Sequence, residues 1–186
     1  MKRFFDIAIS LPLLLATLPL IVFLALVVRL SSSGPGIFRQ VRVGREHRNF
    51  TCYKLRTMAS GTRDAASHLV GTDSITPLGR ILRRHKFDEL PQLWNVLRGD
   101  MSLVGPRPCL PVQDELIAAR EARNVFSVRP GITGMAQVQG IDMSQPELLA
   151  EVDAEYVRNV SLILDISLLW RTFRGTGRNI DAAVAK

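Results

Sequence analysis

Two adjacent carboxylates, Asp88 and Glu89, follow directly on a cluster of basic residues. The basic residues before and after the pair are Arg80, Arg83, Arg84, His85, Lys86, Arg98 and Arg107. If Asp88 begins a helix, as its residue type favours, the helix dipole stabilises its ionised form. A helix N-terminus surrounded by arginines binds phosphate, and an ionised aspartate there can attack phosphorus as a nucleophile. The neighbouring Glu89 allows a divalent cation, Mg²⁺, which would offset phosphate charge.

Other basic residues are placed to contact a phosphate group. Arg107 lies between Pro106 and Pro108, whose fixed φ angles present the arginine from a rigid segment. Lys54 and Arg56 alternate with apolar neighbours and should project from one face of a strand. Each pattern also has a structural interpretation: acids that complement a helix dipole, a connector arginine in solvent, or a solvated strand face.

These residues need several elements to position them. Residues 37–58 predict a β-hairpin with a turn at Gly44. Thr76 and Pro77 predict the N-cap and first residue of a helix that ends near Lys86. The other expected elements are helices over 88–99, 112–123 and 146–158, an extended connector over 104–111, a turn-rich stretch over 129–134 and an amphipathic segment over 162–171.

The N-terminal segment is a candidate membrane element. Residues 7–28 are 22 consecutive residues without a charge, long enough to span a bilayer. A signal peptide is disfavoured by the length of this run. Pro19 near its centre should bend or break a helix, with Thr17 available to bond a freed carbonyl. Both flanks are basic, which favours the cytoplasmic side for both ends; by these residues alone, a straight span and a re-entrant hairpin are equally supported.

Length and composition narrow the class of protein. The chain has 186 residues, 47% of them hydrophobic and 22% charged, which fits one folded domain, or at most two small ones, and excludes a disordered tail. Its two cysteines are too few for a disulfide scaffold and lie in no zinc-binding pattern. A net charge of +7 favours a polyanionic partner: nucleic acid, an anionic membrane or a phosphorylated substrate.

Three motifs give the sequence a more specific resemblance. They are Tyr53–Met58, Asp88–Pro108 and Arg129–Gly134. Together they resemble the bacterial sugar transferase family, the monotopic polyprenyl-phosphate phosphoglycosyl transferases. The resemblance extends from Lys2 to about residue 175 and is to the small, single-domain members of the family.

The resemblance implies a mainly α fold with a small β-hairpin. It implies a re-entrant membrane helix–break–helix over 1–33 with the break at Pro19, a compact cytosolic α/β phosphoglycosyl transferase domain over 34–175 with amphipathic interfacial helices, and a mobile tail over 176–186. The implied location is the cytoplasmic face of the bacterial inner (plasma) membrane, in contact with its lipid.

The resemblance also implies a two-step reaction. Asp88 attacks the β-phosphate of a UDP-sugar and releases UMP. Undecaprenyl phosphate then attacks the covalent phosphosugar intermediate and forms undecaprenyl-diphosphate-sugar, the first membrane step of glycoconjugate biosynthesis. Asp88 and Glu89 would hold Mg²⁺, and Glu89 would assist catalysis. The other residues implied at the site are the phosphate-binding Lys54, Arg83 and Arg107, and further Arg129 and Asp165.

Two departures from the family pattern bear on these expectations. Small members often carry Ser-Pro at the membrane break, whereas Leu18 precedes Pro19 here. Many members carry an arginine soon after a stretch matching Gln137–Gly140, whereas Ile141 stands here, so one basic contact to the nucleotide-sugar is missing. The sequence does not fix the sugar. We expect an N-acetylated hexosamine, either a 6-deoxy sugar or one that keeps its 6-hydroxyl.

Two other functions stay open. A membrane-tethered basic protein could bind anionic lipid or nucleic acid without catalysis, and its binding would be sensitive to salt. A phosphotransferase or phosphatase could act on a polyprenyl diphosphate. The charge pattern fits all of these, but mere binding gives no reason for paired acids inside a basic cluster, so no nucleic-acid partner is expected.

Overall fold

A computed structural model describes residues 1–59, 61 and 74–175 of the chain. The α-helices are α1 (Lys2–Ser31), α2 (Pro77–Arg84), α3 (Gln92–Arg98), α4 (Asp114–Glu121), α5 (Met135–Gln139), α6 (Pro146–Arg158) and α7 (Leu162–Phe173). The strands are β1 (Ile37–Val43), β2 (Asn49–Leu55), β3 (Ser102–Val104) and β4 (Gly131–Thr133). This confirms a mainly helical fold with a small β-hairpin. The tail predicted over 176–186 lies outside the described residues.

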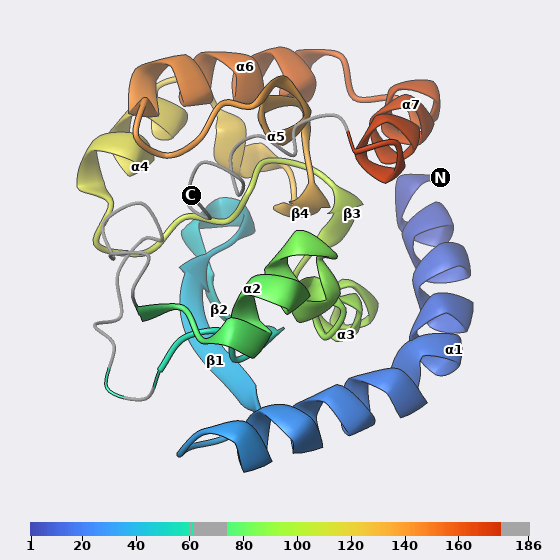
Figure 1. Cartoon of the computed structure of the whole chain (residues 1–186). Coiled ribbons are helices and arrows are strands. Elements are labelled where there is room, and N and C mark those ends of the chain that lie inside the picture. Colours follow the sequence, from blue (N-terminus) through green and yellow to red (C-terminus); the bar gives the residue numbers. More distant parts are fainter. Residues whose placement is uncertain (60, 62–73, 176–186) are drawn as a thin grey trace.

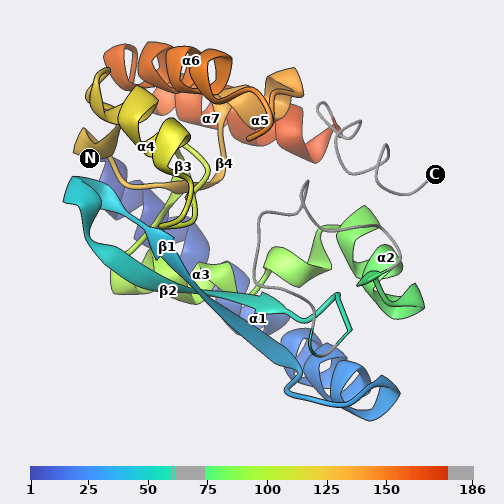
Figure 2. The same cartoon turned by 90° about the vertical axis from the view of Figure 1, so that its left-hand side faces the viewer.

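The elements form two groups with the long first helix along their outside. Helices α4 to α7 lie together at one end of the molecule, above the two short strands β3 and β4 (Figure 1). The hairpin β1–β2 runs through the middle with α2 and α3 beside it, and the view in Figure 2 shows the same grouping from another side. The predicted site residues come from separate elements: Lys54 from the hairpin, Arg83 from α2 and Arg107 from residues 105–110.

The predicted hairpin is present. Strands β1 and β2 pair antiparallel, from Ile37 opposite Leu55 to Val43 opposite Asn49. Directly opposite residues share one face of a sheet, so Lys54 and Cys52 lie on the same face as Phe38 and Gln40. The expected Arg56 lies just past the end of β2 and donates to the carbonyl of Ser32 at 2.9 Å, which ties the hairpin to the end of α1.

The turn expected over 129–134 contains a strand instead. Gly131–Thr133 pairs parallel with Ser102–Val104. The two strands approach so closely that a Cβ on Gly131 would come within 2.1 Å of the backbone nitrogen of Gly105. Glycine is thus required at position 131 because the two backbones approach closely. In the sequence alone, the same glycine indicated a turn.

Helix α3 begins later than expected. The sequence predicted a helix from Asp88, but Phe87–Glu89 forms a 3₁₀ turn and the α-helix starts at Gln92, with Pro91 at its N-cap position. Lys86 adopts the left-handed conformation (φ 58°), which interrupts the helix just before the 3₁₀ turn. Pro91 lacks a backbone N–H and suits the start of a helix. Asp88 is therefore not the N-cap of this helix, although the helix ends at Gly99 as predicted.

The remaining helices agree with their sequence signals. Thr76 caps α2, its Oγ1 accepting a hydrogen bond from the Gly79 backbone nitrogen at 2.9 Å. The helices predicted over 112–123 and 146–158 appear as α4 and α6, and the amphipathic segment expected over 162–171 forms α7. The five-residue α5 was not anticipated, because a single helical turn has too few residues to show a periodic pattern.

Helix α1 is the one helix of the described residues that is long and apolar enough to cross a membrane. It contains Pro12 and Pro19, and Figure 1 shows that it bends near its middle while remaining one helix. A proline removes a backbone hydrogen bond and clashes with the preceding turn, which accounts for the bend. The Thr17 hydroxyl donates to the carbonyl of Leu13 at 2.7 Å and not to the Leu15 carbonyl that Pro19 leaves without its donor, so that expectation was wrong.

Both ends of α1 are docked on the rest of the molecule. Near the N-terminus, the fully buried Asp6 accepts hydrogen bonds from the Ser102 hydroxyl at 3.0 Å and the Leu103 backbone nitrogen at 3.1 Å. Near the C-terminus, Val28 packs in a buried cluster with Leu55 of β2 and Leu82 of α2. The helix is therefore held at its two ends by the same folded unit.

Candidate active site

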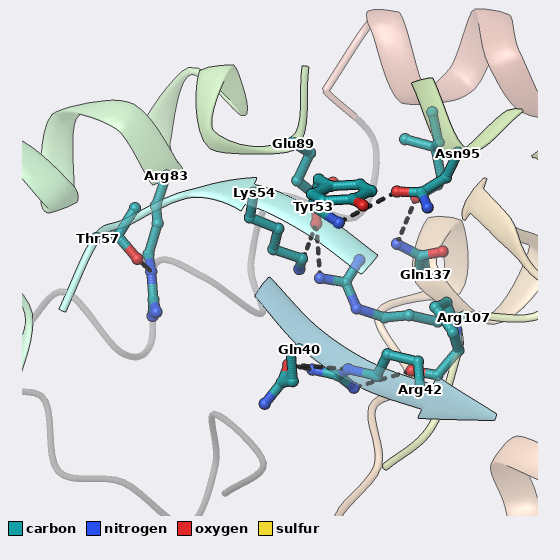
Figure 3. A network of polar contacts seen from close by, with 12 residues as sticks. Gln40, Arg42, Tyr53, Lys54, Thr57, Arg83, Glu89, Asn95, Arg107 and Gln137 are labelled. Atoms are coloured by element: carbon teal, nitrogen blue, oxygen red, sulfur yellow. Dashed lines mark hydrogen bonds and ion pairs between the residues drawn. The ribbon is translucent and has the colours of Figure 1, made fainter. Parts of the chain in front are cut away.

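The centre of the site is the side chain of Glu89, which meets two cations (Figure 3). Its Oε1 atom lies 2.7 Å from Nη2 of Arg107 and 3.3 Å from Nζ of Lys54. The three residues come from the 3₁₀ turn, the 105–110 segment and β2. The Glu89 side chain is only 13% exposed, so these charges interact with little screening by water.

The adjacent Asp88 is buried, with 8% of its surface exposed. Burial raises its pKa to about 6, and the charge of Glu89 adds to this, while Lys54, Arg83 and Arg107 oppose it. Burial alone would also raise the pKa of Glu89, but Arg107 and then Lys54 outweigh it and hold that pKa well below its usual range. The two carboxyls therefore differ: Glu89 is a permanent anion, and Asp88 ionises near neutral pH.

Arg83 belongs to the same cluster from another side. It lies at the end of α2, and its Nε donates to Thr57 Oγ1 at 2.9 Å (Figure 3). Its charge lowers the pKa of Asp88. Arg83 thus acts on Asp88, as Lys54 and Arg107 also do, and the latter two in addition bind Glu89. The structure brings together five of the residues that the sequence proposed for the site: Lys54, Arg83, Asp88, Glu89 and Arg107.

Two other predicted site residues make different contacts. The Arg129 Nε donates to the carbonyl of Gly99 at 2.8 Å, at the end of α3. Asp165 is completely buried on α7, where it accepts hydrogen bonds from Lys2 Nζ at 2.5 Å and from the Tyr156 hydroxyl at 2.7 Å. Asp165 thus fixes the first turn of α1 to α6 and α7.

Sequence reasoning missed two residues beside the cluster. Arg42 of β1 is buried and donates to Gln40 and to the Pro108 carbonyl, the latter at 2.9 Å (Figure 3). Its signal was present in the sequence, because alternation places Gln40 and Arg42 on the face that carries Lys54.

Asn95 was also missed. It is fully buried in α3, and its side chain bonds the backbone of β2, accepting from the Tyr53 nitrogen at 3.1 Å and donating to the Thr51 carbonyl at 2.7 Å. The Asn95 amide satisfies backbone groups on the edge of β2 that a further strand would otherwise bond. It thereby ties α3 to the strand that carries Lys54. An asparagine inside a short helix is unfavourable by propensity, which was its only signal.

The carboxylates offer a limited set of metal ligands. No group of three or more His, Cys, Asp or Glu side chains able to hold a metal occurs in the part of the chain that the structure describes. Mg²⁺ is commonly bound by one or two carboxylates together with substrate phosphates. Asp88 and Glu89 fit that donor set, and they do not fit a metal held by protein ligands alone.

The sequence as a whole matches the profile of bacterial sugar transferases over residues 1–178. The chain belongs to the bacterial sugar transferase family. This confirms the family indicated by the central motif, and with it the prediction of an enzyme. The buried aspartate, its ionised neighbour and the surrounding cations are therefore the candidate active site of a sugar transferase.

Similar proteins cover most of this sugar transferase. The uncharacterized sugar transferase EpsL of Bacillus subtilis is 43% identical over 175 residues, which is 94% of this chain and 86% of EpsL. The UDP-glucose:undecaprenyl-phosphate glucose-1-phosphate transferase of Caulobacter vibrioides is 41% identical, over 92% of this chain and 67% of its own length. The UDP-N-acetylgalactosamine-undecaprenyl-phosphate N-acetylgalactosaminephosphotransferase of Aeromonas hydrophila is 36% identical, over 93% of this chain and 43% of its own.

Proposed function

We propose that this sugar transferase moves a sugar 1-phosphate from a UDP-sugar to undecaprenyl phosphate and releases UMP, through a covalent intermediate on Asp88. The observation that carries the proposal is geometric: Asp88 is buried beside Glu89, whose Oε1 lies 2.7 Å from Arg107 and 3.3 Å from Lys54. Burial raises the pKa of Asp88 to about 6, while Lys54, Arg83 and Arg107 favour its ionised form. The activities for which the Caulobacter and Aeromonas relatives are named support both substrates. Polysaccharide or other glycoconjugate synthesis is the process served.

In the first step, a carboxylate oxygen of Asp88 attacks the β-phosphorus of the UDP-sugar. The new bond joins Asp88 oxygen to phosphorus, and the bond between that phosphorus and the oxygen bridging to the α-phosphorus breaks. UMP leaves with the electron pair. Arg107 and Lys54 offset the charge that develops on the phosphate oxygens, and in a buried site such contacts act with little screening.

In the second step, a phosphate oxygen of undecaprenyl phosphate attacks the phosphorus of the intermediate. The bond from phosphorus to Asp88 breaks and the carboxylate is restored, so no net proton or electron is consumed. Glu89 holds Arg107 and Lys54 in place through both steps. Mg²⁺, held by Asp88, Glu89 and substrate phosphates, would supply further neutralisation of phosphate charge when bound.

A re-entrant placement of α1 in the cytoplasmic face of the inner membrane fits this function. The helix is bent, and its two ends dock on one folded unit through Asp6 and Val28. A straight span would separate its ends by the full thickness of the bilayer, so one of these contacts would be lost. Many large apolar side chains are exposed on α1 and α7, among them Phe4, Leu15, Val22, Phe23, Ile163, Ile166, Trp170 and Phe173.

The sugar is the least constrained part of the proposal. The Caulobacter relative is named for transfer of glucose 1-phosphate and the Aeromonas relative for transfer of N-acetylgalactosamine phosphate. We propose an N-acetylated hexosamine for this enzyme, with Ile141 in place of an arginine altering the contact to the nucleotide-sugar. A panel of UDP-sugars is therefore part of the test.

The test is release of UMP in membranes or nanodiscs that contain undecaprenyl phosphate. Wild-type enzyme should release UMP with at least one UDP-sugar and Mg²⁺, and Asp88→Asn should release none. Without undecaprenyl phosphate, wild-type enzyme should gain the mass of one phosphosugar at Asp88. An adduct at another residue, or turnover by Asp88→Asn, would refute the covalent role of Asp88. A protein that only bound lipid would release no UMP from any donor.

A further inference from the structure

The segment that carries Arg107 is fixed by its carbonyl groups. Residues 105–110 form neither helix nor strand, and Pro106 and Pro108 have no backbone N–H. Four consecutive carbonyls instead accept hydrogen bonds from distant groups: Pro106 from the Gly131 nitrogen at 2.9 Å, Arg107 from Arg120 at 2.9 Å, Pro108 from Arg42 at 2.9 Å and Cys109 from the Val43 nitrogen at 3.0 Å. The backbone under Arg107 thus depends on a side chain, the guanidinium of Arg120.

Arg120 is itself held by a buried ion pair. Its Nε and Nη2 lie 3.0 and 2.6 Å from Oδ2 of Asp153, and its Nη1 makes the bond to the Arg107 carbonyl. Arg120 comes from α4 and Asp153 from α6, and each side chain is 2% exposed. Neither can touch a substrate, so any influence on phosphate must pass through another residue.

The burial of this pair needs an explanation beyond stability. Burying two charges costs as much as or more than their attraction returns, and well-packed apolar residues often serve stability equally well. What apolar residues cannot do is donate a hydrogen bond to the Arg107 carbonyl. The charged pair therefore supplies a hold on the backbone of Arg107 that an apolar pair would lack.

We propose that Arg120 is a positioning residue for Arg107, and that Asp153 orients Arg120 for this purpose. The inference rests on the proposed function for its catalytic readout. With its backbone fixed by Arg120, the Arg107 side chain reaches Glu89 and the substrate phosphate from a defined point. Misplacement of a phosphate-binding group by about 1 Å can reduce the rate roughly 100-fold.

The test variant is the double substitution Arg120→Met and Asp153→Leu, which removes both charges and keeps most of the volume. It should fold, with a melting temperature near that of the wild type, yet lose about 10- to 100-fold in the rate of UMP release. The matched control is Arg123→Met with Glu147→Leu. That pair also joins the α4 end to α6, at 2.8 Å between Arg123 Nη2 and Glu147 Oε2, but it is exposed and should leave the rate unchanged.

A second comparison separates positioning from a general structural role. In an Arg107→Met background, the Arg120→Met and Asp153→Leu substitutions should cause no additional loss, because their effect acts through Arg107. Wild-type activity in the folded double variant, or a full additional loss on top of Arg107→Met, would overturn the proposal. If the double variant does not fold, Arg120→Lys, which keeps the charge but loses the forked donors, takes its place with the same expected outcomes.

A measurement that does not depend on catalysis tests the positioning role even if the proposed function is wrong. A spin label at position 107, introduced by Arg107→Cys, reports backbone order by its mobility; the chain's own cysteines are buried, and the parent chain should remain unlabelled. The label should become more mobile when Arg120→Met and Asp153→Leu are added, but not with the control pair. Unchanged mobility overturns the positioning role even if no UDP-sugar is turned over, whereas increased mobility with no turnover by the wild type refutes only the proposed function.

Discussion

Arg107 donates to Glu89 at a distance of 2.7 Å between Nη2 and Oε1, and so joins the rigid 105–110 segment to the turn that carries Asp88. This contact explains why two neighbouring carboxyls behave differently. Glu89 faces Arg107 and Lys54 and stays ionised, while Asp88 is buried beside that negative charge. The two carboxyls are thereby distinguished by their environment alone, which suits the separate roles proposed for them.

The pH dependence of the first step should report Asp88. Since its pKa is raised to about 6 and only the ionised form attacks phosphorus, kcat/KM should rise about tenfold per pH unit below pH 6 and level off above. Glu89→Gln removes a charge that raises this pKa, so its residual activity should show the rise at lower pH. Adduct formation measured from pH 4.5 to 8 would check both. A profile that is flat through pH 6 would contradict the assignment.

Removal of the Asp88 charge should stabilise the fold at neutral pH. The unfolded chain releases this proton near pH 3.8 and the folded chain near 6, so stability falls as pH rises through that window. The penalty above pH 6 reaches up to about 3 kcal/mol. Asp88→Asn should therefore melt several degrees above wild type at pH 7.5, with a smaller difference at pH 4. If the melting temperatures differed equally at pH 7.5 and pH 4, the raised pKa of Asp88 would not be the cause.

Arginine should be required at position 107. Lysine keeps the charge but cannot make forked contacts to phosphate and Glu89 together. Arg107→Lys should therefore lower kcat/KM by the equivalent of about 1.5–3 kcal/mol. Arg45→Lys, at the exposed hairpin turn, is the control and should leave kcat/KM unchanged. Comparable rates for both variants would make Arg107 a connector residue only.

The contact of Lys2 with Asp165 should contribute to stability. Lys2→Met leaves the buried carboxylate of Asp165 without its cation, and we expect a loss of about 1–3 kcal/mol, reduced because the Lys2 side chain is partly exposed. Adding Asp165→Leu removes the unpaired charge and should recover part of the loss. Thermal unfolding in nanodiscs measures both. If the second substitution deepened the loss, the ion pair would not be the cause.

Topology can be checked by labelling from the two sides of the membrane. A cysteine added before Lys2 and one at Pro35, which is exposed, should both react with an impermeant reagent only after cells are opened. Pro19→Ala should favour a straighter helix and, against the docking contacts at both ends, increase labelling of one position from outside. Labelling of the two wild-type positions from opposite sides would refute the re-entrant placement.

Local signals predicted much of the fold. Thr76 and Pro77 at the start of α2, and Gly99 at the end of α3, were read correctly because a cap or a left-handed residue acts within one turn of the chain. The pairing of Ser102 with Gly131 was missed, because three-residue parallel strands show no alternation and their partners are far apart in sequence. The start of α3 depended on the left-handed Lys86, a conformation that lysine rarely adopts.

The site could be predicted in part for the same reason. Paired acids within a basic cluster must be neutralised by it, so the grouping of Asp88, Glu89 and Arg83 follows from short-range sequence. Arg129 and Asp165 were named from resemblance alone, and their hydrogen bonds with Gly99 and Lys2 depend on long-range packing. Local sequence carries no signal for a contact between residues 163 positions apart.

The docking of both ends of α1 has a practical consequence for producing this enzyme. A fragment that begins after the helix would leave the Leu103 nitrogen without the Asp6 carboxylate and would leave Asp165 buried without Lys2. It would also uncover Leu55 and Leu82 where Val28 now covers them. Trimming the apolar helix to obtain a detergent-free catalytic domain should therefore yield aggregated protein. Since α1 must stay and exposes many apolar side chains, we expect the full chain to need lipid or detergent, quite apart from any need of its substrate for lipid.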